Sequence, residues 1–148
     1  MASNVPTVDP VLQAMFDTMV KGIKKQNRLC KEENQFKVGM NSLPVCYYRH
    51  PQDSSVRCVM GHLIPDEMYD PEMENRNAMG LLRDYPEFAN HLGINSDDYY
   101  DRVAWENPRG KLLRYMQRAH DQSDSVQEFM YKAAKVAKEF NLNDKVTQ

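Results

Sequence analysis

The chain has 148 residues and a formal net charge of −2, and no apolar run is long enough to cross a membrane. A chain of this length can form a single domain with its own core. Its 19 Lys and Arg balance 21 Asp and Glu, which argues against nucleic-acid binding spread over the whole surface. The opening residues, MASNVPTVDP, lack the features of a secretory signal. Three cysteines, an odd number, favour reduced thiols in the cytoplasm.

A helix is predicted near the start of the chain. Asp9 has a side chain suited to a helix N-cap, and Pro10 suits the first helical position. Apolar residues then recur at helical spacing, and lysines follow near the end, where cations stabilise the helix dipole. The pattern predicts a helix over residues 10–29, preceded by a flexible arm over residues 1–8.

A β-hairpin is predicted next. The polar segment 31–44 is expected to be a loop, and VCYYRH and VRCVMG follow it at residues 45–50 and 56–61. These two segments contain β-branched and aromatic residues and flank the turn-forming segment PQDSS. We therefore predict two strands joined by this turn, with the register left open because the turn is longer than the tightest ones.

Helical patterns fill the rest of the sequence. Asp70-Pro71 repeats the Asp-Pro helix start, and Ser125 with Glu128 matches the S-x-x-E capping box. One helix is predicted after Asp70-Pro71 and a brief one after Ser96. Further helices are predicted over residues 86–93, 108–122 and 126–140, followed by a flexible tail over residues 141–148. The predicted fold class is mainly α with a small β-hairpin (α+β), and residues 1–148 form one compact domain.

Two cysteines and a histidine accompany the predicted hairpin. Opposed strands would bring Cys46 and Cys58 together, and the flexible glycine before His62 would let that side chain turn toward them. Zinc binds thiolate and imidazole groups in a tetrahedron, so a fourth ligand is required. His120 is the first candidate because it lies on the apolar side of its helix, and the others are Cys30, His50 and His91. The alternative is that these are buried cysteines and a loop histidine without metal.

Aromatic and basic side chains also gather on the predicted hairpin. Tyr47, Tyr48 and Arg49 lie in its first strand and Arg57 in its second. Aromatic rings stack on bases and guanidinium groups bind phosphate, so these residues form the predicted ligand-binding site. The simpler alternative is that alternate residues pack on the helices while the others face water.

An adjacent histidine and aspartate, His120-Asp121, suggest a second kind of chemistry. Such a pair begins the binuclear site of some metal-dependent phosphohydrolases, which also need an upstream His and a downstream Asp. Only Asp124 and Asp144 remain downstream, so a histidine at a helix end is the competing interpretation. The sequence contains no P-loop, dinucleotide-binding, nucleophile-elbow or zincin motif.

The run CYYRHPQDSSVRCVMGHLIPDEMYDPEMEN resembles a family of small phage and prophage proteins of uncharacterised function, with a Cys-Tyr-Arg strand followed by Cys-x-x-Gly-Cys/His-Leu-Ile-Pro-Asp. LLRYMQRAHD is similar to the family's later Leu-x-x-Leu-Gln-x-x-His-Asp segment. Asn75 stands where that family has Gly. The matching residues are Cys46, Tyr48, Arg49, Cys58, Gly61, His62, Leu63, Ile64, Pro65, Asp66, Tyr69, Pro71 and Glu74. The use of either Cys or His at the position of His62 suits a zinc ligand.

Together, these patterns predict a structural zinc at Cys46, Cys58, His62 and His120, which would join the hairpin to the helices. The resemblance implies a phage accessory protein in the host cytoplasm. We expect it to bind a host protein or a small nucleotide-like signalling ligand without catalysis, and so to counter host defence. The alternatives are a metal-dependent phosphohydrolase acting on a nucleotide, and a nucleic-acid-binding module that uses the hairpin. No membrane partner is expected.

Overall fold

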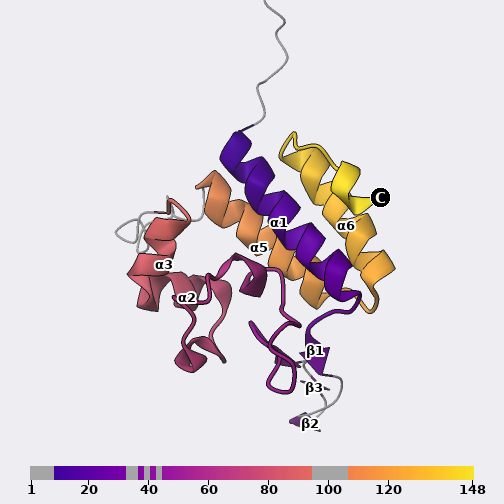
Figure 1. Ribbon diagram of the computed structural model, residues 1–148. Coiled ribbons are helices and arrows are strands. Elements are labelled where there is room, and N and C mark those ends of the chain that lie inside the picture. Colours follow the sequence, from indigo (N-terminus) through magenta and orange to yellow (C-terminus); the bar gives the residue numbers. More distant parts are fainter. Residues whose placement is uncertain (1–8, 33–36, 39–40, 43–44, 95–106) are drawn as a thin grey trace, which may run out of the picture.

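The computed structural model describes residues 9–32, 37–38, 41–42, 45–94 and 107–148, with backbone alone between residues 32 and 46. Its main body is a bundle of long helices that all contact one another (Figure 1). These helices are α1 (Pro10–Gln26), α5 (Pro108–Asp121) and α6 (Val126–Glu139). The predictions of helices in these three regions are confirmed.

The ends of these helices follow from their capping residues. The Asp9 carboxylate accepts the Val11 N–H at 2.9 Å, as predicted for an N-cap. Asn27 has a φ of 55°, and this left-handed backbone ends α1 three residues before the predicted limit at residue 29. The predicted cap at Ser125 is confirmed, because Ser125 accepts the Glu128 N–H at 3.1 Å. The Glu128 carboxylate reaches back one residue beyond the usual capping box and accepts the Asp124 N–H.

Shorter helices and turns lie beside the bundle. α2 (Ala78–Asp84) packs against α3 (Pro86–His91) and against α5. The Asp70-Pro71 start leads only to a single 3-10 turn, η2 (Pro71–Met73). Another 3-10 turn, η1 (Gly61–Leu63), packs on α1. The brief helix expected after Ser96 falls outside the described residues.

The predicted β-hairpin is not formed, so the α+β assignment was wrong and the described fold is mostly helical. Residues 56–61 contain no strand, although His50 N–H donates to the Val56 carbonyl at 2.9 Å. Glu74 accepts the amide hydrogens of Tyr48 and Arg49. In a strand these neighbouring N–H groups would point to opposite sides, so binding both to one carboxylate is incompatible with a regular ladder here.

Strand pairing involves other segments. Two-residue strands β1 (Lys31–Glu32) and β4 (Val45–Cys46) pair antiparallel. A second antiparallel pair joins β2 (Lys37–Val38) to β3 (Asn41–Ser42). The segment predicted as the first hairpin strand therefore begins by pairing with a segment that had been expected to be a loop.

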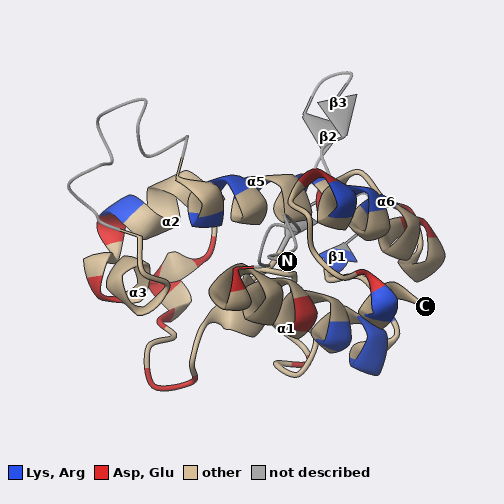
Figure 2. Ribbon diagram, turned by 90° about the horizontal axis from the view of Figure 1, so that it is seen from above, with Lys and Arg blue, Asp and Glu red and all other residues tan. Residues whose placement is uncertain are grey.

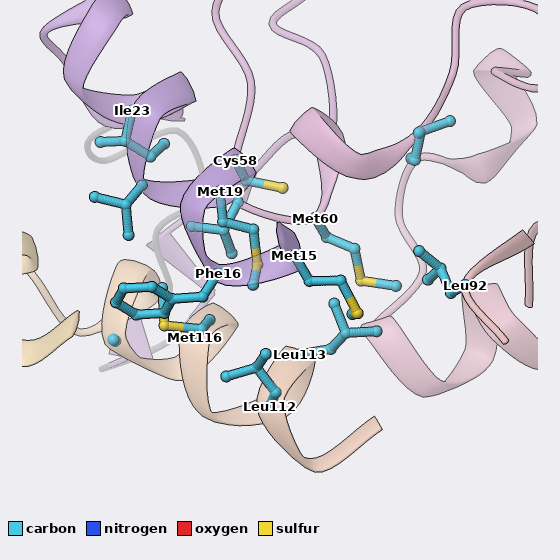
Figure 3. Packing of buried hydrophobic residues seen from close by; sticks show 14 of the residues in the cluster. Met15, Phe16, Met19, Ile23, Cys58, Met60, Leu92, Leu112, Leu113 and Met116 are labelled. Carbon is cyan, nitrogen blue, oxygen red and sulfur yellow. The ribbon is translucent and has the colours of Figure 1, made fainter. Parts of the chain in front are cut away.

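The core lies between the bundle and the chain that wraps beneath it. Figure 3 shows Met15, Phe16, Met19 and Ile23 of α1 facing Leu112, Leu113 and Met116 of α5, with Cys58, Met60 and Leu92 nearby. Phe129 of α6 is also fully buried. Long methionine side chains fill irregular gaps.

The segment that was expected to be a flexible tail lies against the first helix. Leu142 is buried, and η4 (Lys145–Thr147) contacts both α1 and α6. Gln13 and Asn143 exchange two hydrogen bonds of 3.0 and 2.8 Å. Residues 1–8, the predicted arm, lie outside the described part of the chain.

Candidate functional site

Two arginines converge on one carboxylate oxygen at the surface. Arg49 Nη2 lies 2.7 Å from Asp66 Oδ1, and Arg57 Nη2 lies 3.3 Å from the same atom. The Asp66 side chain is 77% exposed, whereas those of Arg49 and Arg57 are 12% and 23% exposed. The guanidinium groups are therefore the more buried partners, and the carboxylate is the more exposed one. We call Arg49 and Arg57 the guanidinium pair.

Arg49 is held in place by its neighbours. Glu74 accepts the backbone N–H groups of Tyr48 and Arg49 and the Tyr69 hydroxyl, at 2.9, 3.1 and 2.7 Å. The Arg49 guanidinium lies 4.1 Å from the centre of the Tyr69 ring, and its Nη2 also donates to the Ile64 carbonyl. Burial and the hydrogen bond to Glu74 raise the pKa of Tyr69, so its hydroxyl keeps its proton and remains a donor.

Arg57 is anchored to the end of α1 and to the preceding turn. Its backbone N–H donates to Gln26 Oε1 at 3.0 Å, and its Nε donates to the Ser54 carbonyl at 2.9 Å. The turn itself is tightened by Asp53, which accepts the N–H and the hydroxyl of Ser55. These hydrogen bonds lower the pKa of Asp53. The guanidinium of Arg57 thus needs little ordering before it binds an anion.

The two tyrosines of the predicted ligand site have different surroundings. Tyr48 is 7% exposed, and its hydroxyl donates to the Arg76 carbonyl at 2.5 Å, so its ring belongs to the core. Burial is the largest cause of its raised pKa. Tyr47 is half-buried and lies edge-on to the His50 ring, with 5.6 Å between the ring centres. Of the two rings, that of Tyr47 is the more exposed.

His62 packs closely against α1. A Cβ added to Gly22 would lie 2.5 Å from the Nδ1 and Cδ2 atoms of the His62 ring, so glycine is needed for this approach. His62 Nε2 lies 2.8 Å from Gln26 Oε1. That oxygen already accepts the Arg57 N–H, so Nε2 is the donor. Burial, helped by the charge of Arg57, lowers the pKa of His62 to about 4. The ring is neutral at pH 7.

His120 is completely buried and joins distant segments. Its Nε2 accepts the Cys30 backbone N–H at 3.2 Å, which places the ring proton on Nδ1. Nδ1 lies 3.1 Å from Asp121 Oδ1, and Gln117 donates to the same oxygen. Both ring nitrogens of the predicted ligand are engaged within the protein. The His120-Asp121 pair therefore links α5 to the chain after α1.

The predicted zinc ligands do not form a recognisable cluster in the described part of the chain. Among these residues, no three His, Cys, Asp or Glu side chains are arranged to hold a metal ion. Cys58 Sγ accepts the Gly61 N–H at 3.4 Å, while His62 and His120 have the partners given above. The side chain of Cys46 lies outside the described residues. The zinc site remains a prediction that these contacts do not favour.

The remaining candidate ligands have structural surroundings. Cys30 is buried, and its Sγ donates to the Val56 carbonyl at 3.4 Å. His50 Nδ1 accepts the Gln52 N–H at 3.1 Å. His91 stacks on Phe88 with 6.5 Å between ring centres.

Asp66, Tyr69 and Glu74 complete the site, and the sequence had not placed them in the predicted ligand-binding site; Glu74 had been considered only as a metal-binding or solvated carboxylate beside Glu72. All three belong to the run on which the family resemblance rests, and this was the only signal that grouped them. Their spacing forms no known motif, because the contacts depend on how η2 turns the chain back toward Arg49. Asn75, directly after Glu74, has a φ of 68°. This left-handed backbone explains why Gly would also suit the position.

No protein-family model, curated protein or solved structure gives a significant match to this chain. Among the helices that the structure describes, none combines the length and the apolar character that a membrane crossing requires.

Proposed function

We propose that this chain binds a small phosphate-bearing ligand of the nucleotide type at the guanidinium pair, without chemically changing it. The observation that carries the proposal is that Arg49 and Arg57 reach the same anionic oxygen, 2.7 and 3.3 Å away. Guanidinium groups are well suited to phosphate because their parallel N–H donors match its oxygens. Asp66 acts as an internal anion that a phosphate displaces.

The energetics favour this exchange. Asp66 is exposed, so its ion pairs with the arginines are weak, on the order of 1 kcal/mol or less each. A phosphate group carries more charge and more acceptor oxygens than a carboxylate. The arginines are already ordered by Glu74, Tyr69 and Gln26, so binding immobilises few side chains. Tyr47 offers part of its ring to the body of the ligand.

The biological setting follows from the family resemblance. We place the protein in the host cytoplasm during phage infection, where sequestering a nucleotide signal would blunt a defence response. A host protein that presents a phosphate group is the other partner that this site accommodates.

Calorimetric titration with pyrophosphate and with ADP tests the proposal. Arg57→Ala should weaken binding about tenfold or more, because a hydrogen bond to a charged group contributes about 1.5–3 kcal/mol. Asp66→Asn should strengthen binding several-fold by removing the competing charge. Arg83→Ala is the control, since Arg83 is also paired with an aspartate, Asp84, at 3.2 Å, but lies outside the guanidinium pair.

The proposal is wrong if neither probe binds the wild-type protein or Asp66→Asn at millimolar concentration, or if Arg83→Ala weakens binding as much as Arg57→Ala. Incubation of ADP with the protein and Mg²⁺ or Zn²⁺ separates binding from turnover. Unchanged ADP is expected. Phosphate release that is lost in His120→Ala, in a variant that remains folded, would support the phosphohydrolase alternative instead.

A further inference from the structure

Charge is distributed unevenly over the fold, despite the near-neutral total. α5 and α6 together contain seven Lys and Arg but three Asp and Glu, a net charge of +4. The whole chain carries −2, so the remaining residues carry −6. Figure 2 shows the basic positions of α5 and α6 along one side of the bundle and those of α1 on the other. The pair of helices α5 and α6 is thus net basic in a net acidic chain.

A groove follows the contact between α5 and α6 on this basic side. It has a volume of about 430 Å³, and its lining includes Tyr115, Arg118, Lys132 and Lys135. Lys111 and Lys135 lie near aromatic rings, 5.8 Å from the centre of Tyr115 and 4.4 Å from that of Tyr131. Three cationic side chains thus share the lining with one carboxylate, that of Glu139, and aromatic rings lie beside the cations.

Several of these cations are available to a partner. Among the ion pairs found within the described residues, none includes Lys111, Arg118, Lys135 or Lys138. All four residues are exposed. Lys132 differs, because it lies 3.0 Å from Glu128 and donates to the Gln122 carbonyl. The unpaired cations can replace counterions along a polyanion.

Tyr131 is the most exposed large hydrophobic residue found in the described part of the chain, with 63% of its surface accessible. It lies on α6, one helical turn before Lys135 and two before Lys138. Exposed aromatic rings beside cations suit nucleic-acid bases, which stack on them when they are not paired in a duplex. A purely acidic peptide would use the charges but not the rings.

We infer that the α5–α6 face binds single-stranded nucleic acid, with the phosphates on Lys111, Arg118, Lys135 and Lys138 and a base stacked on Tyr131. This site uses none of the residues of the guanidinium pair. It replaces the predicted hairpin as the nucleic-acid surface. Because few base edges would be read, binding is expected to depend little on sequence and strongly on salt.

Fluorescence anisotropy with a labelled 20-nucleotide oligo-dT, measured from 50 to 200 mM salt, tests the inference. Tyr131→Ala should weaken binding about tenfold through lost stacking. Arg118→Ala/Lys135→Ala should reduce the slope of log affinity against log salt by about 1.4, because two phosphate contacts are lost. All these side chains are exposed, so melting curves should match the wild type.

Two controls make the test specific. Lys21→Ala/Lys25→Ala removes the same charge from exposed positions of α1, on the other side of the bundle, and should leave the affinity nearly unchanged. Arg57→Ala should also have no effect, which separates this surface from the guanidinium pair. The inference is overturned if oligo-dT fails to bind at 50 mM salt, if the α1 variant loses as much affinity, or if polyglutamate competes as well as unlabelled oligo-dT. The last result would identify an acidic protein as the partner.

Discussion

The contact between Gly22 and His62 can be tested by adding a single methyl group. Gly22→Ala would place its Cβ 2.5 Å from two atoms of the His62 ring, whereas ordinary contacts begin near 3.4 Å. The ring cannot move without losing the 2.8 Å hydrogen bond from Nε2 to Gln26. Overpacking costs about 1–3 kcal/mol and the lost hydrogen bond about 1 kcal/mol.

The same substitution has an opposing benefit. Alanine is favoured over glycine inside a helix by about 1 kcal/mol. The net result for Gly22→Ala should therefore be a loss of about 1–3 kcal/mol in the free energy of unfolding. In a His62→Ala background the overlap disappears, so Gly22→Ala should there gain about 0.5–1 kcal/mol.

Urea unfolding followed by circular dichroism measures all four proteins of this double-mutant cycle. The sign of the Gly22→Ala effect should reverse between the two backgrounds. If Gly22→Ala is equally destabilising with and without His62, the close approach of ring and helix described here would be refuted. A stabilising effect in the wild-type background would refute it as well.

Other predictions follow from single side chains. The pKa of His62 is about 4 in the folded protein, below its unfolded value of 6.5, so the unfolded state takes up the proton first as the pH falls. The free energy of unfolding should therefore decrease between pH 6.5 and pH 4. In melting curves measured over this pH range, His62→Gln should weaken the decrease. Glu74→Gln places an amide NH₂ donor against a backbone N–H that Glu74 now accepts, and should lower the free energy of unfolding in urea by about 1–3 kcal/mol. It should also weaken pyrophosphate binding, because Arg49 loses part of what holds it in place. Ser125→Ala should cost about 0.5–2 kcal/mol by removing the cap on the Glu128 N–H, and Ser125→Asp should restore most of it.

The sequence predicted those elements whose signals are local. Asp9 and Ser125 mark helix starts by their own side chains, and the apolar spacing after them specifies the buried faces. The hairpin prediction failed because the amides of Tyr48 and Arg49 are satisfied by Glu74, 25 or more residues away. No local pattern contains that information.

The candidate site was predictable only in part. Arginines beside aromatic residues indicated anion binding, and the structure brings Arg49 and Arg57 to one carboxylate. Their supports, Glu74 and Tyr69, depend on the path of the chain through η2, which spacing does not reveal. The α5–α6 face was missed for another reason, because charges on separate helices form one surface only after packing.

The hydrogen bonds between Gln13 and Asn143 join residues that are 130 positions apart. At synthesis rates of 5–20 residues per second, Gln13 leaves the ribosome's active centre roughly 7–26 s before its partner is made. During that interval α1 exists without α6 and η4, and its methionine-rich face is open to chaperones. The rate of translation between these two residues therefore sets how long α1 waits for the partners that cover it.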